Sequence, residues 1–264
     1  MTDKPVTIAH IQEMKNRGEK ISMVTGYDYP FARLLDQSGI DMILVGDSVG
    51  VVVAGYPNTL PVTVDEMIYH GRAVMRGSQR ALVVIDMPFM SYQISIEDAK
   101  RQAGRIMQQT GAAAVKLEGG VSMAATIEAL VSIGIPVLGH IGLTPQAVNQ
   151  LGGFKVQREK ERLLADARAV ADAGAFGVVI ECVPADIAAE ITGAIDIPTI
   201  GIGAGPECDG QVLVLHDLLG LFDRFRPSFV KQYANLGPTI TKALQQYHQE
   251  VKEGTFPSAE YSFK

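Results

Sequence analysis

Eight short apolar, β-branched segments recur along this chain, and their repetition constrains the fold more than any other feature of the sequence. Each segment is bounded by Gly, Pro or Asp, and the stretches between them carry apolar residues every three to four positions. This alternation indicates strands that are separated by helices. The predicted strands are residues 21–25, 41–46, 81–86, 113–118, 135–140, 177–182, 197–202 and 211–215.

The predicted strands are almost continuously hydrophobic, which is typical of a parallel sheet that is buried on both faces. Helical spacing is clearest in residues 63–78, 95–112 and 159–175, and the first two of these segments open on Thr or Ser before an acidic residue. Eight strand-helix units favour a (β/α)8 TIM barrel. A doubly wound open sheet remains the alternative, because the same alternation builds both folds.

The chain is expected to form a single domain over residues 1–264, because no Pro- or Ser-rich linker interrupts it and its length suits one large core. An N-terminal helix is predicted at about residues 7–18. A C-terminal helical extension is predicted at about residues 226–253. This extension and the long connection at residues 49–61 are candidates for a lid or an interface.

The charge and residue content exclude several classes of protein. A net charge of -6 and the lack of a basic run argue against binding to nucleic acid. The two cysteines, Cys182 and Cys208, form neither a metal-ligand spacing nor a disulfide framework. No apolar run approaches the length of a membrane span, and the N-terminus is polar. We therefore expect the whole chain to be a cytoplasmic protein with no membrane partner.

Polar side chains stand at the carboxyl ends of the predicted strands, where the active site of a barrel forms. Taken singly, each has an ordinary structural explanation: Asp28 precedes a helical segment and suits an N-cap, and Asp47 and Asp86 could cap turns. His140 alone is more often a hydrogen-bonded structural histidine than a ligand or a base. The candidates at these strand ends are Asp47, Ser48, Asp86, Lys116, Glu118, His140 and Glu181.

Taken together, the four carboxylates predict a metal site. Asp47, Asp86, Glu118 and Glu181 would meet at one mouth with one lysine among them, and uncompensated carboxylates repel one another. Lys116 and Glu118 fall on the same strand face because they lie two residues apart. An all-oxygen set without paired cysteines selects a hard cation such as Mg2+, which usually takes one or two carboxylates together with substrate oxygens.

The chain also resembles a known family, the ketopantoate hydroxymethyltransferases, over nearly its whole length. The resemblance lies in ordered motifs. They are TGYDYPFA, LVGDSVG, TLPVTVDEMIYH, DMPFMSY, VKLEGG, PVLGHIGLTPQ, GGFKVQ, ECVP, IPTIGIGAG and DGQVLVLHDLLG.

The resemblance implies a barrel of the phosphoenolpyruvate/pyruvate-binding type that assembles as a homodecamer and binds Mg2+. The implied reaction transfers a hydroxymethyl group from the co-substrate 5,10-methylenetetrahydrofolate to 3-methyl-2-oxobutanoate through a Mg-stabilised enolate, as the first step of pantothenate biosynthesis. The implied roles are metal ligation by Asp47, Asp86 and Glu118, and proton abstraction by Glu181. The residues expected to contact the substrate are Asp47, Ser48, Asp86, Lys116 and His140.

One departure from the family pattern is visible, because Arg158 follows GGFKVQ where a glycine and a longer loop are usual. This difference concerns the loop and not the metal site. Two other functions stay open on the sequence: a magnesium-dependent lyase or mutase acting on another 2-oxo acid, and a non-catalytic barrel that senses a metabolite. The chain lacks the KKCGH run of the related isocitrate-lyase group, which disfavours the first.

Overall fold

A computed structural model describes residues 4–263 of the chain. The chain divides into two compact units, Met1–Val214 and Leu215–Lys264, and each is described by itself. The prediction of one domain over the whole chain stays a prediction.

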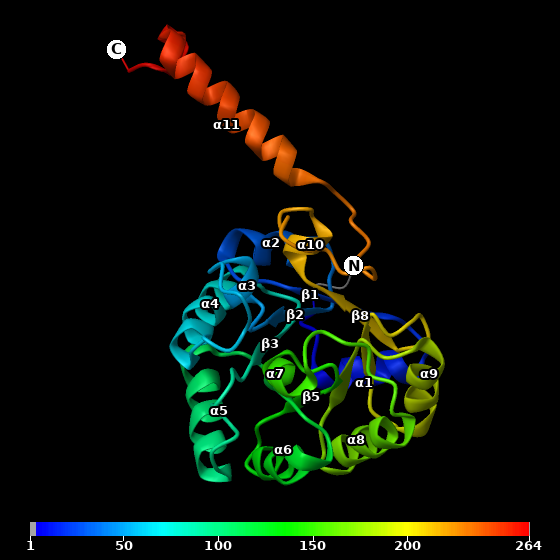
Figure 1. The fold of residues 1–264 in the computed structure, drawn as a ribbon. Helices are drawn as coiled ribbons and strands as arrows, with labels where there is room; N and C mark the ends of the chain where they lie inside the picture. Colours follow the sequence, from blue (N-terminus) through cyan, green and yellow to red (C-terminus); the bar gives the residue numbers. More distant parts are fainter. Residues whose placement is uncertain (1–3, 264) are drawn as a thin grey trace. The chain divides into compact units, whose positions relative to one another are not determined.

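The first unit is a closed barrel of parallel strands in the order β1 to β8, with helices around it (Figure 1). The closed ring confirms the predicted (β/α)8 barrel and excludes the open sheet. Its strands are β1 Ile21–Thr25, β2 Met42–Val45, β3 Leu82–Asp86, β4 Ala114–Glu118, β5 Val137–Gly142, β6 Gly177–Glu181, β7 Thr199–Ile202 and β8 Gly210–Leu213. The helices of this unit are α1 Ile8–Asn16, α2 Tyr29–Gln37, α3 Val49–Val52, α4 Val64–Gly77, α5 Ile96–Thr110, α6 Ala124–Val131, α7 Val148–Leu151, α8 Lys160–Asp172 and α9 Ala185–Ala194.

Three helices begin where the capping residues predicted them. Asp28 accepts a hydrogen bond from the Phe31 main-chain N–H at 2.8 Å, so it is the N-cap of α2. Thr63 and Glu66 form a reciprocal capping box at the start of α4, and Ser95 caps α5. These caps satisfy main-chain N–H groups that have no partner within the helix.

The observed strands match the predicted ones to within two residues at each end. The largest shift is in β5, which was predicted at residues 135–140 and spans Val137–Gly142. Pro136 has no N–H to donate to the neighbouring strand, so regular pairing begins after it. The expectation that β5 ends at His140 was therefore wrong. His140 lies two residues before the end, where it pairs with Glu118 of β4.

Side chains from the inner face of the strands fill the lower part of the barrel. Leu44, Val84, Leu138 and Val179 belong to one buried cluster. Residues of α1, including Ile11, are part of the same cluster, so this N-terminal helix completes the core at the amino ends of the strands.

No helix separates β7 from β8 in the described part of the chain, so this connection is shorter than the others. The Asp209 carboxylate holds it in place by accepting hydrogen bonds from the Thr199 main-chain N–H (2.8 Å) and hydroxyl (3.0 Å). Lys15 of α1 forms an ion pair with the same carboxylate at 2.9 Å. The start of β7, the connection and α1 are therefore linked through one side chain.

The second unit contains α10 Leu215–Leu218 and α11 Leu236–Glu253. The predicted helical extension began near residue 226, whereas α11 begins ten positions later, after Asn235. Pro227 interrupts the earlier stretch, while Pro238 lies within the first turn of α11, where proline is tolerated. The helix ends as predicted, because Gly254 adopts the left-handed conformation with φ 70°.

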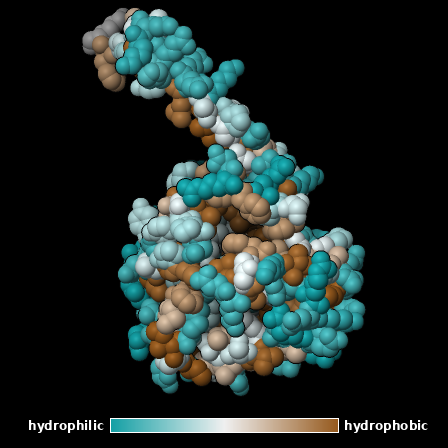
Figure 2. Space-filling model, viewed as in Figure 1, coloured by the Kyte–Doolittle hydropathy of each residue, from teal (hydrophilic) through white to brown (hydrophobic). Residues whose placement is uncertain are grey.

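The surface and the helix lengths bear on membrane contact. On the face shown in Figure 2, hydrophobic patches are separate and lie among hydrophilic residues. Within residues 4–263, no helix is both long enough and apolar enough to cross a membrane.

Candidate active site

The pleat of the strands brings the predicted residues together at the carboxyl end of the barrel. Inward-facing positions alternate along each strand, and the last inward position on several strands is polar rather than apolar. The series are Leu82, Val84 and Asp86 on β3; Ala114, Lys116 and Glu118 on β4; Leu138 and His140 on β5; and Val179 and Glu181 on β6. Asp47 and Ser48 follow directly after β2, and all seven candidates line one pocket.

Asp47, Asp86 and Lys116 form the buried centre of this pocket. The Asp47 main-chain N–H donates to Asp86 Oδ2 at 2.9 Å. Lys116 Nζ lies 2.8 Å from Asp86 Oδ1, in an ion pair whose two side chains are almost completely buried. One ammonium therefore stands among several carboxylates, as the sequence predicted.

His140 lies between the remaining two carboxylates. Its Nδ1 atom is 3.4 Å from Glu118 Oε1, and its Nε2 atom is 3.1 Å from Glu181 Oε2. The second contact is a close approach without the alignment of a hydrogen bond. Lys116 Nζ lies 3.3 Å from His140 Nδ1. The His140 ring therefore lies between Lys116 and Glu181, with one ring nitrogen near each side chain.

Ser48 is placed by a residue from the neighbouring strand end. Its hydroxyl lies 2.8 Å from the hydroxyl of Tyr27, which is itself buried after β1. Ser48 is the N-cap residue of the short helix α3, but its side chain makes no capping hydrogen bond. The hydroxyl thus faces the pocket instead of the helix.

The main chain after Glu181 turns sharply. Cys182 adopts a positive φ of 50°, which is uncommon for a residue with a side chain and occurs often at functional sites. Its N–H donates to the Ile202 carbonyl (2.9 Å), and its carbonyl accepts from the Gln157 N–H (2.8 Å). Glu181 is consequently the last residue of β6 and is held on a constrained segment. Its carboxylate is partly accessible, with 16% of the side chain exposed.

The crowding of charges shifts the proton equilibria of the acids at the centre. Burial, reinforced by the charges of Asp86 and Glu118, raises the pKa of Asp47 to about 8. Burial also raises the pKa of Asp86, although the adjacent Lys116 opposes the shift.

The pKa values of the two bases are also raised, but by the neighbouring acids and not by burial. Burial alone would lower the pKa of Lys116, but Asp86, Glu118 and Asp47 outweigh it and raise that pKa above its ordinary value. Burial and the Lys116 charge would lower the pKa of His140, but its contacts with Glu118 and Glu181 raise it to about 9. The pKa values of both bases therefore lie above those of the free side chains.

The oxygen atoms at the centre suit a hard cation. Asp86 Oδ1 and Glu118 Oε1 are buried, and their neighbours are the nitrogens of Lys116 and His140, in contacts without the alignment of a hydrogen bond. Within residues 4–263, no three His, Cys, Asp or Glu side chains converge closely enough to hold a metal ion by themselves. Mg2+ is usually held by one or two carboxylates with water and substrate oxygens, so the side chains present fit it without a complete protein cage.

Sequence reasoning missed two residues that hold the acids of this pocket in place. Gln146 and Tyr92 are buried, and they contact Asp47 and Glu118 through hydrogen bonds. Neither residue is titratable near neutral pH, and neither lies on a strand. A search for titratable side chains at the ends of the predicted strands therefore could not find these two residues.

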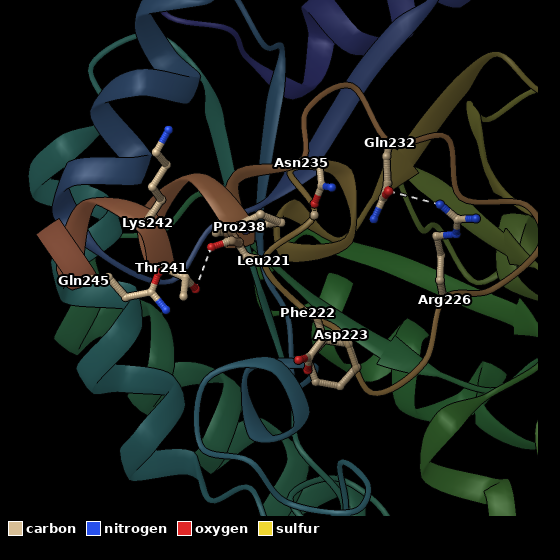
Figure 3. A pocket seen from close by; sticks show the side chains of 12 residues that line it. Leu221, Phe222, Asp223, Arg226, Gln232, Asn235, Pro238, Thr241, Lys242 and Gln245 are labelled. Atoms are coloured by element: carbon tan, nitrogen blue, oxygen red, sulfur yellow. Dashed lines mark hydrogen bonds between the residues drawn. The ribbon is translucent and has the colours of Figure 1, made fainter.

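A larger pocket of about 720 Å³ lies in the second unit, between residues 220 and 245 (Figure 3). Its polar contacts include hydrogen bonds from Arg226 to Gln232 and from Thr241 to the Gly237 carbonyl. Asp223 is the one acid among its lining residues. None of the candidate residues lines it, so it lacks the charged cluster found at the barrel mouth.

Comparison with known proteins decides the family. The family model for ketopantoate hydroxymethyltransferase matches residues 5–259. The chain belongs to this family. It is 60% identical over 263 residues to the 3-methyl-2-oxobutanoate hydroxymethyltransferase of Moorella thermoacetica, covering 98% of each chain. It is 61% identical to the enzyme of the same name from Geotalea daltonii, covering 98% of this chain and 99% of that one. This member of the ketopantoate hydroxymethyltransferase family is therefore a transferase.

Solved structures with low sequence identity share the barrel of this hydroxymethyltransferase. A phosphonopyruvate hydrolase in complex with oxalate and Mg++ aligns with a TM-score of 0.63 at 12% identity, covering 99% of this chain and 93% of that one. A 2,3-dimethylmalate lyase of the PEP mutase/isocitrate lyase superfamily aligns with a TM-score of 0.62 at 18% identity, covering 97% and 91%. These likenesses support the fold alone.

Proposed function

We propose that the chain transfers a hydroxymethyl group to 3-methyl-2-oxobutanoate. The donor is 5,10-methylenetetrahydrofolate, water is consumed, and the products are 2-dehydropantoate and tetrahydrofolate, as in the first step of pantothenate biosynthesis. The observation that supports this proposal is that Glu181 lines the same pocket as Lys116 and the three acids Asp47, Asp86 and Glu118. The chain is also about 60% identical to proteins named 3-methyl-2-oxobutanoate hydroxymethyltransferase.

The metal that this proposal requires is Mg2+. Asp47, Asp86 and Glu118 would surround it in the pocket, with one or two of them as direct ligands and the rest acting through bound water, because the three do not converge closely enough to hold an ion by themselves. When bound, Mg2+ supplies positive charge that stabilises the negative charge developing on the substrate's ketone oxygen. The phosphonopyruvate hydrolase with the same fold carries Mg++ together with oxalate, a small dicarboxylate, which is consistent with this assignment.

Lys116 and Ser48 bind the substrate in this proposal. The Lys116 ammonium is 4% exposed and remains protonated, so it can neutralise the 2-oxo acid carboxylate in a site that excludes most water. The Ser48 hydroxyl donates a second hydrogen bond and is oriented by Tyr27. Together they would fix the substrate with C3 facing β6.

Glu181 acts as the base. Its carboxylate takes the proton from C3, and the electron pair of the C–H bond moves toward the ketone oxygen to give the enolate. His140, 3.1 Å from Glu181 Oε2, restrains the carboxylate from the side. Water adds to the methylene carbon of the donor, and both carbon–nitrogen bonds break as the two nitrogens of tetrahydrofolate take the protons of water, which releases formaldehyde. C3 then forms a carbon–carbon bond to the formaldehyde carbon, and the former water oxygen takes the proton held by Glu181 to become the hydroxyl.

Self-association into a homodecamer in the cytoplasm is also part of the proposal. Exposed apolar side chains recur along α11 at positions 240, 244, 247 and 251, which is the spacing of one helix face. Such a stripe favours burial against another protein surface. Light scattering would give ten times the 28.3 kDa chain mass if the assembly is a decamer.

Product formation tests the proposed reaction. Purified protein with Mg2+, 3-methyl-2-oxobutanoate and 5,10-methylenetetrahydrofolate is expected to form 2-dehydropantoate, measured by mass spectrometry. Omission of either substrate, or chelation of the metal, should abolish the product. If the protein bound the 2-oxo acid but formed no product, the proposed catalytic activity would be contradicted and a role as a metabolite sensor would be supported. Cleavage of the 2-oxo acid would instead support a lyase.

A further inference from the structure

Gln146 is a buried amide beside the acidic cluster that the proposed reaction does not yet use. It follows β5 in the short 3-10 helix Pro145–Ala147, and only 7% of its surface is exposed. Its side-chain Nε2 donates to Asp47 Oδ2 at 2.9 Å and to the Met87 carbonyl at 3.0 Å. Its Oε1 accepts from the Tyr92 hydroxyl at 2.7 Å and from Gln93 Nε2 at 3.1 Å. All four hydrogen-bonding positions of the amide are therefore in use.

The partners fix the direction in which this amide points. The Met87 carbonyl can only accept, so the NH2 group must face Met87, and its second N–H then points at Asp47. Rotation of the amide by half a turn would place its oxygen against both acceptors. The contact between Gln146 and Asp47 is thus determined by four neighbouring groups.

Gln146 also holds a second carboxylate through its main chain. Its N–H donates to Glu118 Oε2 at 3.0 Å. The other oxygen of that carboxylate, Oε1, is buried and has no contact with Gln146; its neighbour is His140 Nδ1 at 3.4 Å, without the alignment of a hydrogen bond. Gln146 therefore engages acids from the ends of β2 and β4 and binds only one oxygen of Glu118.

Tyr92 ties this arrangement to the end of β4. Its hydroxyl accepts from the Glu118 main-chain N–H at 3.1 Å, in addition to its bond with Gln146. The tyrosine is 2% exposed, so the bonds are shielded from water. Gln146 and Tyr92 together restrict how far Asp47 and Glu118 can move apart or rotate.

We propose that Gln146 is a positioning residue that presets Asp47 and Glu118 for a divalent cation, so that its side chain governs the metal affinity of the site. The inference rests on the proposed function, because that function assigns the two acids to the metal. Partners of this kind, which contact the ligands and not the ion, typically change metal affinity by about 10- to 100-fold when they are replaced.

The test replaces Gln146 by methionine, which keeps the volume and the main-chain N–H but removes all four side-chain hydrogen bonds. Mn2+ alone is titrated into the metal-free protein, and free Mn2+ is followed by electron paramagnetic resonance. Gln146→Met is expected to bind Mn2+ about 10- to 100-fold more weakly than the unaltered chain. Gln150→Met is the matched control, because Gln150 is exposed in the same segment, and its affinity should not change.

A second measurement separates positioning from a general loss of structure. In Gln146→Met, the rate of C3 hydrogen exchange of the 2-oxo acid should fall at limiting Mn2+ and recover at saturating Mn2+. If Gln146→Met does not fold, Tyr92→Phe carries the same test, with a smaller expected loss of affinity because the Gln146 amide remains.

Two results would overturn the inference. Mn2+ affinity within twofold of the unaltered chain in a folded variant would show that Gln146 does not set the site. An exchange defect that persists at saturating Mn2+ would assign it a structural role only. If the unaltered chain itself bound no Mn2+, both the proposed metal site and the positioning role of Gln146 would be wrong.

Discussion

Glu181→Gln is expected to bind 3-methyl-2-oxobutanoate with nearly unchanged affinity and to lose turnover by about 100- to 10,000-fold, the range typical of a positioned general base. The amide keeps the size and polarity of the carboxylate at the end of β6, so contacts with His140 can persist. It cannot take a proton from C3. Calorimetric binding of the 2-oxo acid and steady-state turnover, measured on the same preparation, separate these two effects.

Glu190→Gln is the control for this substitution. Glu190 lies on α9, the next helix, where it forms an exposed ion pair with Lys160, so the change removes the same charge away from the pocket. Its turnover should equal that of the unaltered chain. Turnover in Glu181→Gln within a fewfold of the unaltered chain would remove the base from this mechanism.

Asp47→Asn is expected to lose divalent-metal affinity and turnover together, while the metal-free protein gains stability at neutral and higher pH. The affinity loss should exceed about 100-fold, because replacement of a residue outside the ligand set already costs up to that amount. The asparagine oxygen can still accept from Gln146, and its NH2 group removes the repulsion from Asp86. Mn2+ titration and thermal unfolding in a chelating buffer measure the two effects.

The pH dependence of this stability has a definite sign. The pKa of Asp47 is raised from 3.8 to about 8 in the folded chain. Between those values the folded state binds more protons than the unfolded state, so the Asp47 contribution to stability falls as pH rises from about 4 to about 8. Asp47→Asn should therefore raise the unfolding midpoint at pH 8 by several degrees, and this difference should shrink toward pH 4.

Asp196→Asn is the matched control, because Asp196 is exposed in the connection before β7 and carries the same charge. It should shift neither the metal affinity nor the pH dependence of the unfolding midpoint. A lower midpoint for Asp47→Asn at pH 8 would show that Asp47 stabilises the metal-free fold, contrary to the account.

The sequence predicted the barrel and the convergence of its polar strand ends because both follow from local patterns. A period of two along a strand places Lys116 and Glu118 on one face, and parallel strands bring their carboxyl ends to one mouth. Asp28 was predicted as a helix cap from its immediate neighbours, and the structure confirms it. The catalytic and metal-binding roles of the mouth residues stay predictions until the substitutions are made.

The residues that the sequence did not reveal depend on contacts between distant segments. Gln146 reaches Asp47 across the mouth, and Tyr27 meets Ser48 from a neighbouring strand end. No local spacing encodes either contact. The prediction that β5 ends at His140 was also wrong. The register of pairing with β4 determines the place of His140 along the barrel, and the end of the apolar segment in the sequence does not.

Exchange of the C3 hydrogen of 3-methyl-2-oxobutanoate with D2O, followed by proton NMR without folate, shows whether the protein removes the C3 proton. It isolates proton removal by Glu181 from the transfer that follows. The C3 signal is expected to disappear in the presence of protein and Mg2+, and to persist with Glu181→Gln and in a chelating buffer. A C3 signal that stays undiminished with the unaltered protein, Mg2+ and bound 2-oxo acid would contradict this expectation.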